Sequence, residues 1–184
     1  MKASFEKRKE IHTARLDLRP SKDDRDLEIY VSHLKEEDCF LYQYGEGYSE
    51  ELEEAISFDS GYVIYYSIFL KDTDIMVGYI GILPLEDGER SGDLEFHVYK
   101  EFRQNGFGYE AATAILDRFV SGELAGEKPN LLTATIIHGN LASASLLEKL
   151  DFTKVASGFR VYYDHGEQKT VGICAYEKRF MSAG

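Results

Sequence analysis

A short segment with two glycines, Arg103-Gln-Asn-Gly-Phe-Gly108, lies between an expected strand and an expected helix. Its glycines allow the backbone to turn tightly and to come close to a ligand. The first N–H groups of the following helix have no partner within that helix, so they point at whatever lies in the loop. Such a loop is a typical phosphate site, and the charge of Arg103 would suit a diphosphate.

Taken alone, this loop leaves two other interpretations open. Gly106 to Ala111 also fits the G-x-G-x-x-A form of a dinucleotide-binding fingerprint. The loop lies in the middle of the chain, however, and no second set of strand–helix units follows it. The plainer alternative is a tight turn that binds nothing.

The segments around the loop predict a strand over residues 94–99, a helix over 109–120 and a strand over 131–137. This strand–helix–strand unit should form a parallel pair with a right-handed crossover. Outside it, strands are expected over 15–19, 62–70, 76–83, 155–163 and 170–180. Helices are expected over 27–34, from Ser49 onward, and over 141–150. The fold class is therefore α/β, with antiparallel hairpins on both sides of the parallel pair.

The second informative stretch is Asn140-Leu-Ala-Ser-Ala-Ser-Leu-Leu-Glu-Lys-Leu-Asp-Phe152. Asn140 is a good N-cap residue. The leucines at positions 146, 147 and 150 form one apolar stripe. On its own this stretch predicts no more than a capped amphipathic helix.

Together, Arg-x-x-Gly-x-Gly before one helix and Asn-x-x-Ser-x-x-Leu-Leu-Glu-Lys-Leu-x-Phe at the next closely resemble the GNAT superfamily. Within it they resemble the RimJ/RimL branch, which includes ribosomal-protein N-terminal acetyltransferases. Residues 13–20, residues 78–82 and the last hairpin are similar to that branch too. The resemblance covers about residues 13–180, so we expect one domain over 1–184. Residues 1–12 are expected to form a disordered or loosely attached extension.

The resemblance implies a mixed, mostly antiparallel sheet of seven strands, with about four helices on its faces and its central parallel pair splayed into a V. It also implies acetyl-CoA (coenzyme A) as acyl donor and no metal. The pantetheine would pair with the backbone at Phe96 and Val98, and would be reached by Asn140 and Ser143. The diphosphate would bind at Arg103, Gln104, Asn105, Gly106, Phe107, Gly108 and Tyr109.

The sequence departs from the family pattern at three positions that bear on catalysis. Many members have a tyrosine acid where Leu147 stands, and the RimL-like alternative is a serine, which matches Ser143. The usual glutamate before the glycine loop is Asp93, and the usual tryptophan is His97. These changes leave the identity of the general base open.

The expected chemistry requires a base, because a primary amine near pH 7 is mostly protonated. Asp93, Glu95 and His97 alternate along a strand and should share one face. Asp93 and Glu95 are the candidate bases, and Ser143 is the candidate hydrogen-bond donor to the leaving thiolate. Solvent-facing charges and a serine that contacts only backbone or coenzyme are the alternatives. His97, Tyr42 and Tyr44 are candidates for the acceptor site, although packing is a commoner role for such tyrosines.

Composition narrows the class of protein further. The formal charge of −12 over 184 residues opposes a nucleic-acid surface and is compatible with a cationic acceptor, although charge speaks first to solubility. The two cysteines, Cys39 and Cys174, form no metal or redox pattern. No apolar run reaches the roughly 18–20 residues of a membrane span, and the N-terminus is too charged for a signal peptide. A cytoplasmic monomer or homodimer with no membrane or nucleic-acid partner is expected.

Three functions remain open. The first is acetylation of a protein N-terminal amine. The second is the same reaction on a small cationic amine, such as a polyamine, an aminoglycoside or an amino acid. The third is a coenzyme A-binding sensor without turnover.

Overall fold

The computed structural model describes residues 8–36, 56, 58, 64–85, 91–124, 129–164 and 167–180. Its strands are β1 (Ile11–His12), β2 (Leu16–Pro20), β3 (Ile64–Leu70), β4 (Met76–Pro84), β5 (Ser91–Val98), β6 (Leu131–Ile137), β7 (Thr153–Asp164) and β8 (Glu167–Arg179). Its helices are α1 (Asp23–Glu36), the short 3-10 helix η2 (Lys100–Phe102), α4 (Phe107–Val120) and α5 (Leu141–Lys149).

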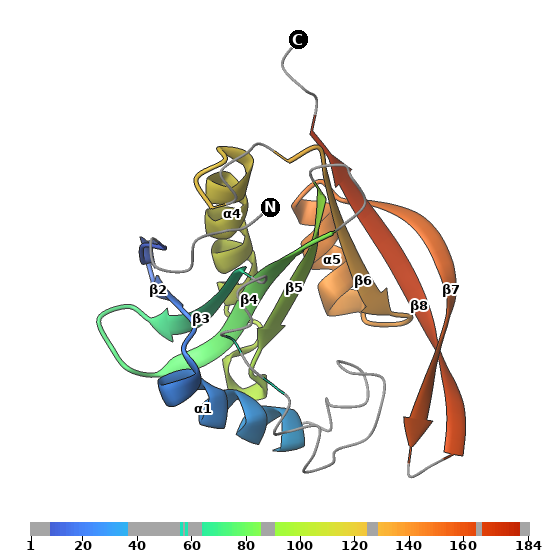
Figure 1. Cartoon of the computed structure of the whole chain (residues 1–184), viewed down its shortest axis with the longest axis horizontal. Helices are drawn as coiled ribbons and strands as arrows, with labels where there is room; N and C mark the ends of the chain where they lie inside the picture. The colour runs from blue at the N-terminus through green and yellow to red at the C-terminus, as the bar shows by residue number, and fades with distance from the viewer. Residues whose placement is uncertain are drawn as a thin grey trace.

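These strands form one sheet in the order β1-β2-β3-β4-β5-β6-β8-β7. Only β5 and β6 are parallel, and α4 joins them; the other neighbouring pairs are antiparallel. Helix α1 packs on one face of the sheet, and α4 and α5 pack on the other (Figure 1). The predicted mixed α/β architecture with a central parallel pair is confirmed.

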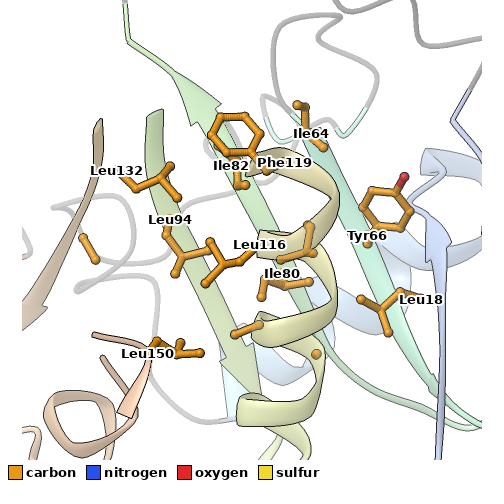
Figure 2. Packing of buried hydrophobic residues seen from close by; sticks show 14 of the residues in the cluster. Leu18, Ile64, Tyr66, Ile80, Ile82, Leu94, Leu116, Phe119, Leu132 and Leu150 are labelled. Atoms are coloured by element: carbon orange, nitrogen blue, oxygen red, sulfur yellow. The ribbon is translucent and has the colours of Figure 1, made fainter. Parts of the chain in front are cut away.

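The main core lies between α4 and the sheet. Ala111, Ala112, Ile115, Leu116 and Phe119 are buried on α4, at the helical spacing of the sequence pattern. Figure 2 shows Leu116 and Phe119 over the side chains of β4 and β5. Burial of each large apolar side chain contributes about 1.5–3 kcal/mol. This packing fixes the start of α4, and with it the glycine loop, against the centre of the sheet.

The parallel pair is short and then opens. β5 and β6 are in register at Ser91–Leu131, Gly92–Leu132 and Asp93–Thr133. From there β5 continues beside β4 as far as Val98, and β6 continues beside β8 as far as Ile137. The two strands therefore diverge into the predicted V just after Asp93.

The last two strands, β7 and β8, form a hairpin that is longer than the neighbouring strand β6. β8 pairs with β6 only from Ile173 to Arg179. Residues 160–164 and 167–171 are paired with each other alone. This two-stranded ribbon extends past the end of β6 (Figure 1).

Several details differ from the sequence-based expectations. The sheet has an eighth strand, because Ile11 and His12 pair with Leu18 and Asp17 although the sequence analysis assigned them to an extension. Ile11 is buried, so this pairing covers the edge of the core. β5 begins at Ser91 rather than at residue 94, since Ser91 pairs with Leu131 of β6, and Gly92 pairs with both β4 and β6. Three α-helices lie in the described part of the chain; the helix expected from Ser49 lies outside it, as do Tyr42 and Tyr44.

Candidate active site

The opening between β5 and β6 is bordered by the glycine loop, residues 103–106. Gln104 has φ +64° and Gly106 has φ +78°, so the backbone turns through two left-handed positions before α4 begins. At Gly106 a side chain would be strained by about 1–2 kcal/mol. The loop is therefore built around the glycine that the sequence analysis singled out.

The loop presents a row of backbone donors. Within the described part of the chain, no protein acceptor takes the N–H groups of residues 104–109, whereas the N–H of Glu110 already bonds to the carbonyl of Gly106 at 3.1 Å. Consecutive N–H groups at the start of a helix attract anions, aided by the helix dipole. This geometry suits a phosphate or diphosphate.

The predicted loop residues do not all point the same way. The Arg103 side chain donates from Nε to the carbonyl of Val98 at 2.9 Å, so it lies back along the end of β5. A Cβ on Gly108 would lie 3.0 Å from Cδ1 of Leu146, which shows how closely α4 approaches α5 there. Gly108 is thus a packing position as well as a loop position.

The start of α5 lies on the same side of the opening. Asn140 caps the helix, and its Oδ1 accepts from the N–H of Ser143 at 3.1 Å. That bond leaves the Nδ2 amide of Asn140 as the group suited to donate to a ligand carbonyl. Leu147 is fully buried in the core, so this helix has no acid at the position of the family tyrosine. We refer to residues 103–109 with Asn140 and Ser143 as the loop side.

The facing part of the site carries acids. Asp93, Glu95 and His97 alternate along β5, and Leu94 on the same strand points into the core. Thr133 of β6 donates a hydrogen bond from Oγ1 to Oδ1 of Asp93. Glu95 comes two residues later, where β5 and β6 have already parted. We refer to Asp93, Glu95 and His97 as the carboxylate side.

Glu95 is held by a residue that the sequence analysis did not identify. Tyr65 of β3 donates its hydroxyl to Oε2 of Glu95 at 2.6 Å, across the intervening strand β4. The residue between them in register is Gly81. A Cβ there would lie inside van der Waals contact with the Tyr65 ring, so only glycine lets the ring lie over β4. Tyr65, Gly81 and Glu95 lie opposite one another on three neighbouring strands. This strand register is the signal that could have identified Tyr65.

Burial sets the protonation of the two carboxylates. It raises the pKa of Glu95 above its usual range, and the nearby Asp93 raises it further. The Tyr65 hydrogen bond and the charge of Arg160 oppose that rise. Burial also raises the pKa of Asp93, against the bond from Thr133 and the charge of Arg160. Carboxylates with raised pKa values are suited to proton transfer near neutral pH.

His97 belongs to an aromatic group on this face. Its ring is parallel to that of Tyr79 at a centroid distance of 5.9 Å and tilted against Tyr99 at 5.8 Å. Both tyrosines are buried. Because its ring packs against two tyrosines, His97 is better suited to shaping the site than to accepting a proton.

A hollow of about 670 Å³ lies beside the loop on the outer side of α4. It is lined by Thr13, Arg15, Gly106, Tyr109, Glu110, Thr113, Ala114, Asp117 and Lys149.

Among the described residues, no group of three or more His, Cys, Asp or Glu side chains could hold a metal ion. None of the helices in that part of the chain is both long and apolar enough to cross a membrane.

The fold and this opening define an acyltransferase, and comparison with known proteins agrees. Residues 15–153 match the family described as "Acetyltransferase (GNAT) domain". This chain belongs to the GNAT family and is an N-acetyltransferase. Enzymes of this family use acetyl-CoA.

Individual relatives support the same conclusion. The chain is 26% identical over 164 residues to YoaA of Bacillus subtilis, an uncharacterized N-acetyltransferase, with 85% of this chain and 89% of that protein covered. RimL, a ribosomal-protein α-N-acetyltransferase solved with coenzyme A, superposes with a TM-score of 0.70 at 16% identity, over 93% of this chain and 98% of that one. An acetyltransferase of Salmonella typhimurium that modifies the N-terminal serine of a ribosomal protein gives 0.72 at 15% identity, over 94% and 100%. At these identities the two structures show a shared fold.

Proposed function

We propose that this N-acetyltransferase acts on the N-terminal α-amine of a protein or peptide. The observation that carries the proposal is Glu95, a partly buried carboxylate fixed by Tyr65 where β5 and β6 part. Glu95 comes two residues after the last β5–β6 pair, so it borders the opening that we propose for the acyl group. The shared fold with enzymes that act on ribosomal-protein N-termini supports a peptide acceptor.

The residues of the loop side fit acetyl-CoA. The N–H groups of residues 104–109 would bind the diphosphate, and the Nδ2 amide of Asn140 would donate to the pantetheine. The edge of β5 that has parted from β6, at Phe96 and Val98, offers backbone groups for the same arm. When bound, acetyl-CoA supplies the acetyl group as a thioester.

The proton of the acceptor ammonium goes to Glu95, directly or through a water molecule. The raised pKa of Glu95 makes its carboxylate a stronger base than an exposed glutamate. Asp93 lies on the same face and helps to attract the positively charged amine before it is deprotonated. Asp93 is the weaker candidate base, because Thr133 holds it at the closed end of the opening.

Ser143 has the task of supporting the leaving thiolate. Its backbone N–H already bonds to Asn140 in the first turn of α5, which leaves the hydroxyl to donate a hydrogen bond as charge develops on sulfur. A thiol has a pKa of about 8.5, so its full protonation during the transfer is not needed.

A thiol-release assay with an acceptor panel tests the proposal. The panel holds short peptides with a free N-terminus, the same peptides with a blocked N-terminus and an internal lysine, spermidine, an aminoglycoside and free amino acids. We expect turnover with the free-N-terminus peptides and little with the blocked ones. Turnover confined to the small amines would favour a small cationic acceptor, the alternative that is compatible with the formal net charge of −12. Release with no member of the panel would contradict both.

A further inference from the structure

The glycine loop is tied to a distant part of the chain by one arginine. Arg15 lies in the turn between β1 and β2, and its Nη1 donates to the carbonyl oxygen of Asn105 at 2.9 Å. Its guanidinium also lies over the ring of Phe107, 4.9 Å from the centroid. Arg15 therefore contacts both the loop, at Asn105, and the first residue of α4, Phe107.

A glutamate fixes this arginine. Nε and Nη2 of Arg15 contact Oε2 of Glu110 at 2.7 and 2.6 Å. Oε1 of the same carboxylate accepts from the N–H of Arg15 at 2.9 Å and from the hydroxyl of Thr13 at 2.6 Å. Burial alone would raise the pKa of Glu110, but these bonds outweigh it and hold the pKa below its usual value. Glu110 is therefore a charged anchor in the first turn of α4.

The bond to Asn105 sets the direction of one peptide unit. The Asn105–Gly106 peptide is trans, so its C=O and its N–H point in opposite directions. With the carbonyl held by Arg15, the N–H of Gly106 points away from Arg15. It is one of the donors in the row over residues 104–109.

Because residue 106 is a glycine, the orientation of the Asn105–Gly106 peptide is easily lost. A glycine adopts either sign of φ easily, so the preceding peptide can rotate at little cost. A rotated peptide would turn the Asn105 carbonyl, a partial negative charge, into the anion site. An external donor on that carbonyl prevents this.

We propose that Arg15, anchored by Glu110, is a positioning residue that orients the Asn105–Gly106 peptide for the coenzyme diphosphate. This inference rests on the proposed binding of the diphosphate at the glycine loop. Arg15 is placed to act through the loop, because Nη1 donates to the carbonyl of Asn105 while Glu110 holds Nε and Nη2. The Arg15 side chain is half exposed, and exposed ion pairs add little stability. We therefore expect Arg15 to contribute little to the free energy of unfolding.

The first experiment measures coenzyme A binding by calorimetry. Arg15→Gln should bind coenzyme A about tenfold more weakly, with a melting temperature close to that of the unaltered protein. Arg15→Lys keeps the charge but loses the fork that reaches both Asn105 and Glu110, so it should bind as weakly as Arg15→Gln. Full recovery in Arg15→Lys would overturn the proposal in favour of simple charge attraction.

The second experiment uses donors that differ in their phosphates. The kcat/KM of Arg15→Gln should fall about tenfold with acetyl-CoA and remain unchanged with S-acetylpantetheine, which has no diphosphate. It should fall equally with acetyl-3′-dephospho-CoA. A defect that disappears with the dephospho donor would mean that Arg15 contacts the 3′-phosphate directly, and an equal defect with S-acetylpantetheine would mean general damage. Either result overturns the inference.

Arg19 provides the matched control. It lies four residues further on in β2, pairs with Asp74 at 2.8 Å and packs over Phe69, away from the loop. Arg19→Gln should leave coenzyme affinity unchanged. If Arg15→Gln fails to fold, Glu110→Gln removes the anchor instead and should show the same donor selectivity.

The same data separate this inference from the proposed function. If the unaltered protein binds coenzyme A and a side chain at Gly106 abolishes that binding, the loop site stands. Unchanged affinity in Arg15→Gln would then overturn the role of Arg15 alone. If a side chain at Gly106 has no effect, the loop site itself is wrong.

Discussion

The loop side and the carboxylate side of the opening are built in different ways. On the loop side the candidate binding groups are backbone N–H groups, positioned by Gly106 and by the start of a helix. On the carboxylate side the candidate bases are Asp93 and Glu95, which bond to Thr133 and Tyr65 from other strands. The backbone turn of the first is set mainly by neighbouring residues, whereas the side-chain contacts of the second depend on the register of the whole sheet. The predictions below test this difference.

The largest effect is expected at Glu95. Glu95→Gln keeps the shape and the acceptor for Tyr65 but removes the basic carboxylate. We expect kcat/KM to fall by roughly 10²–10⁴-fold, with coenzyme A affinity unchanged in calorimetry. Glu148→Gln, on the exposed face of α5, is the control and should retain full activity.

The competing assignments are tested in the same assay. Asp93→Asn and His97→Ala should each lose less activity than Glu95→Gln. If Glu95→Gln keeps nearly full activity across the pH range, the base lies elsewhere, and the carboxylate side only attracts the amine.

The next effect concerns the loop side. Gly106→Ala forces a side chain into a φ of +78° and puts its Cβ 3.5 Å from Nη2 of Arg15. The loop and its row of N–H groups should shift, so coenzyme A affinity should fall by roughly tenfold to a hundredfold in calorimetry. Gly122→Ala is the matched control, because Gly122 has φ +83° just after α4 and far from the loop. Both variants should lose similar stability. Equal coenzyme affinity in the two would contradict a diphosphate site at the loop.

Ser143 should show an effect confined to turnover. Ser143→Ala removes the hydroxyl and keeps the N–H that bonds to Asn140. We expect kcat to fall about tenfold, which is 1.4 kcal/mol of barrier, with little change in coenzyme A affinity. A matching loss of affinity would show that Ser143 is only a coenzyme contact, and an unchanged rate would show that the thiolate leaves without its help.

The smallest effect is a shift in the pH profile of Tyr65→Phe. The Tyr65 hydrogen bond stabilises the charged form of Glu95 and so lowers its pKa; removal lets burial raise that pKa further. Since the deprotonated carboxylate is the active form, the acidic limb of kcat/KM should move to higher pH. Activity on that limb should fall by roughly two- to tenfold, and activity at alkaline pH should change little. A uniform loss at every pH would instead indicate structural damage.

The local backbone of the loop side was predictable from the sequence, whereas its role in coenzyme binding stays a prediction. The two motifs located the turn before α4 and the cap of α5, and Leu131–Ile137 came out with the predicted bounds. These features depend on neighbouring residues and on helical or strand periodicity. The alternation of Asp93, Glu95 and His97 was also predictable, because it needs only the two-residue period of a strand.

What the sequence did not show depends on contacts between distant segments. Tyr65 and Glu95 meet only because Gly81 lies between them in a specific register. Arg15 reaches Asn105 because the first hairpin packs beside the start of α4. The paired Ile11 and His12 likewise had no local signal. Such features require the coordinates of the whole sheet.

The ribbon at the end of the β7–β8 hairpin has a consequence for the acid–base behaviour of the site. Two strands without a third are only marginally stable in water, so residues 160–164 and 167–171 should exchange their amide protons faster than the base of the hairpin. Arg160, whose charge lowers the pKa of both Asp93 and Glu95, lies on this ribbon. Fraying removes that charge from the carboxylates. Warming should therefore shift the pH optimum upward in step with amide exchange. The pKa values of Asp93 and Glu95 would then depend on temperature through the hairpin.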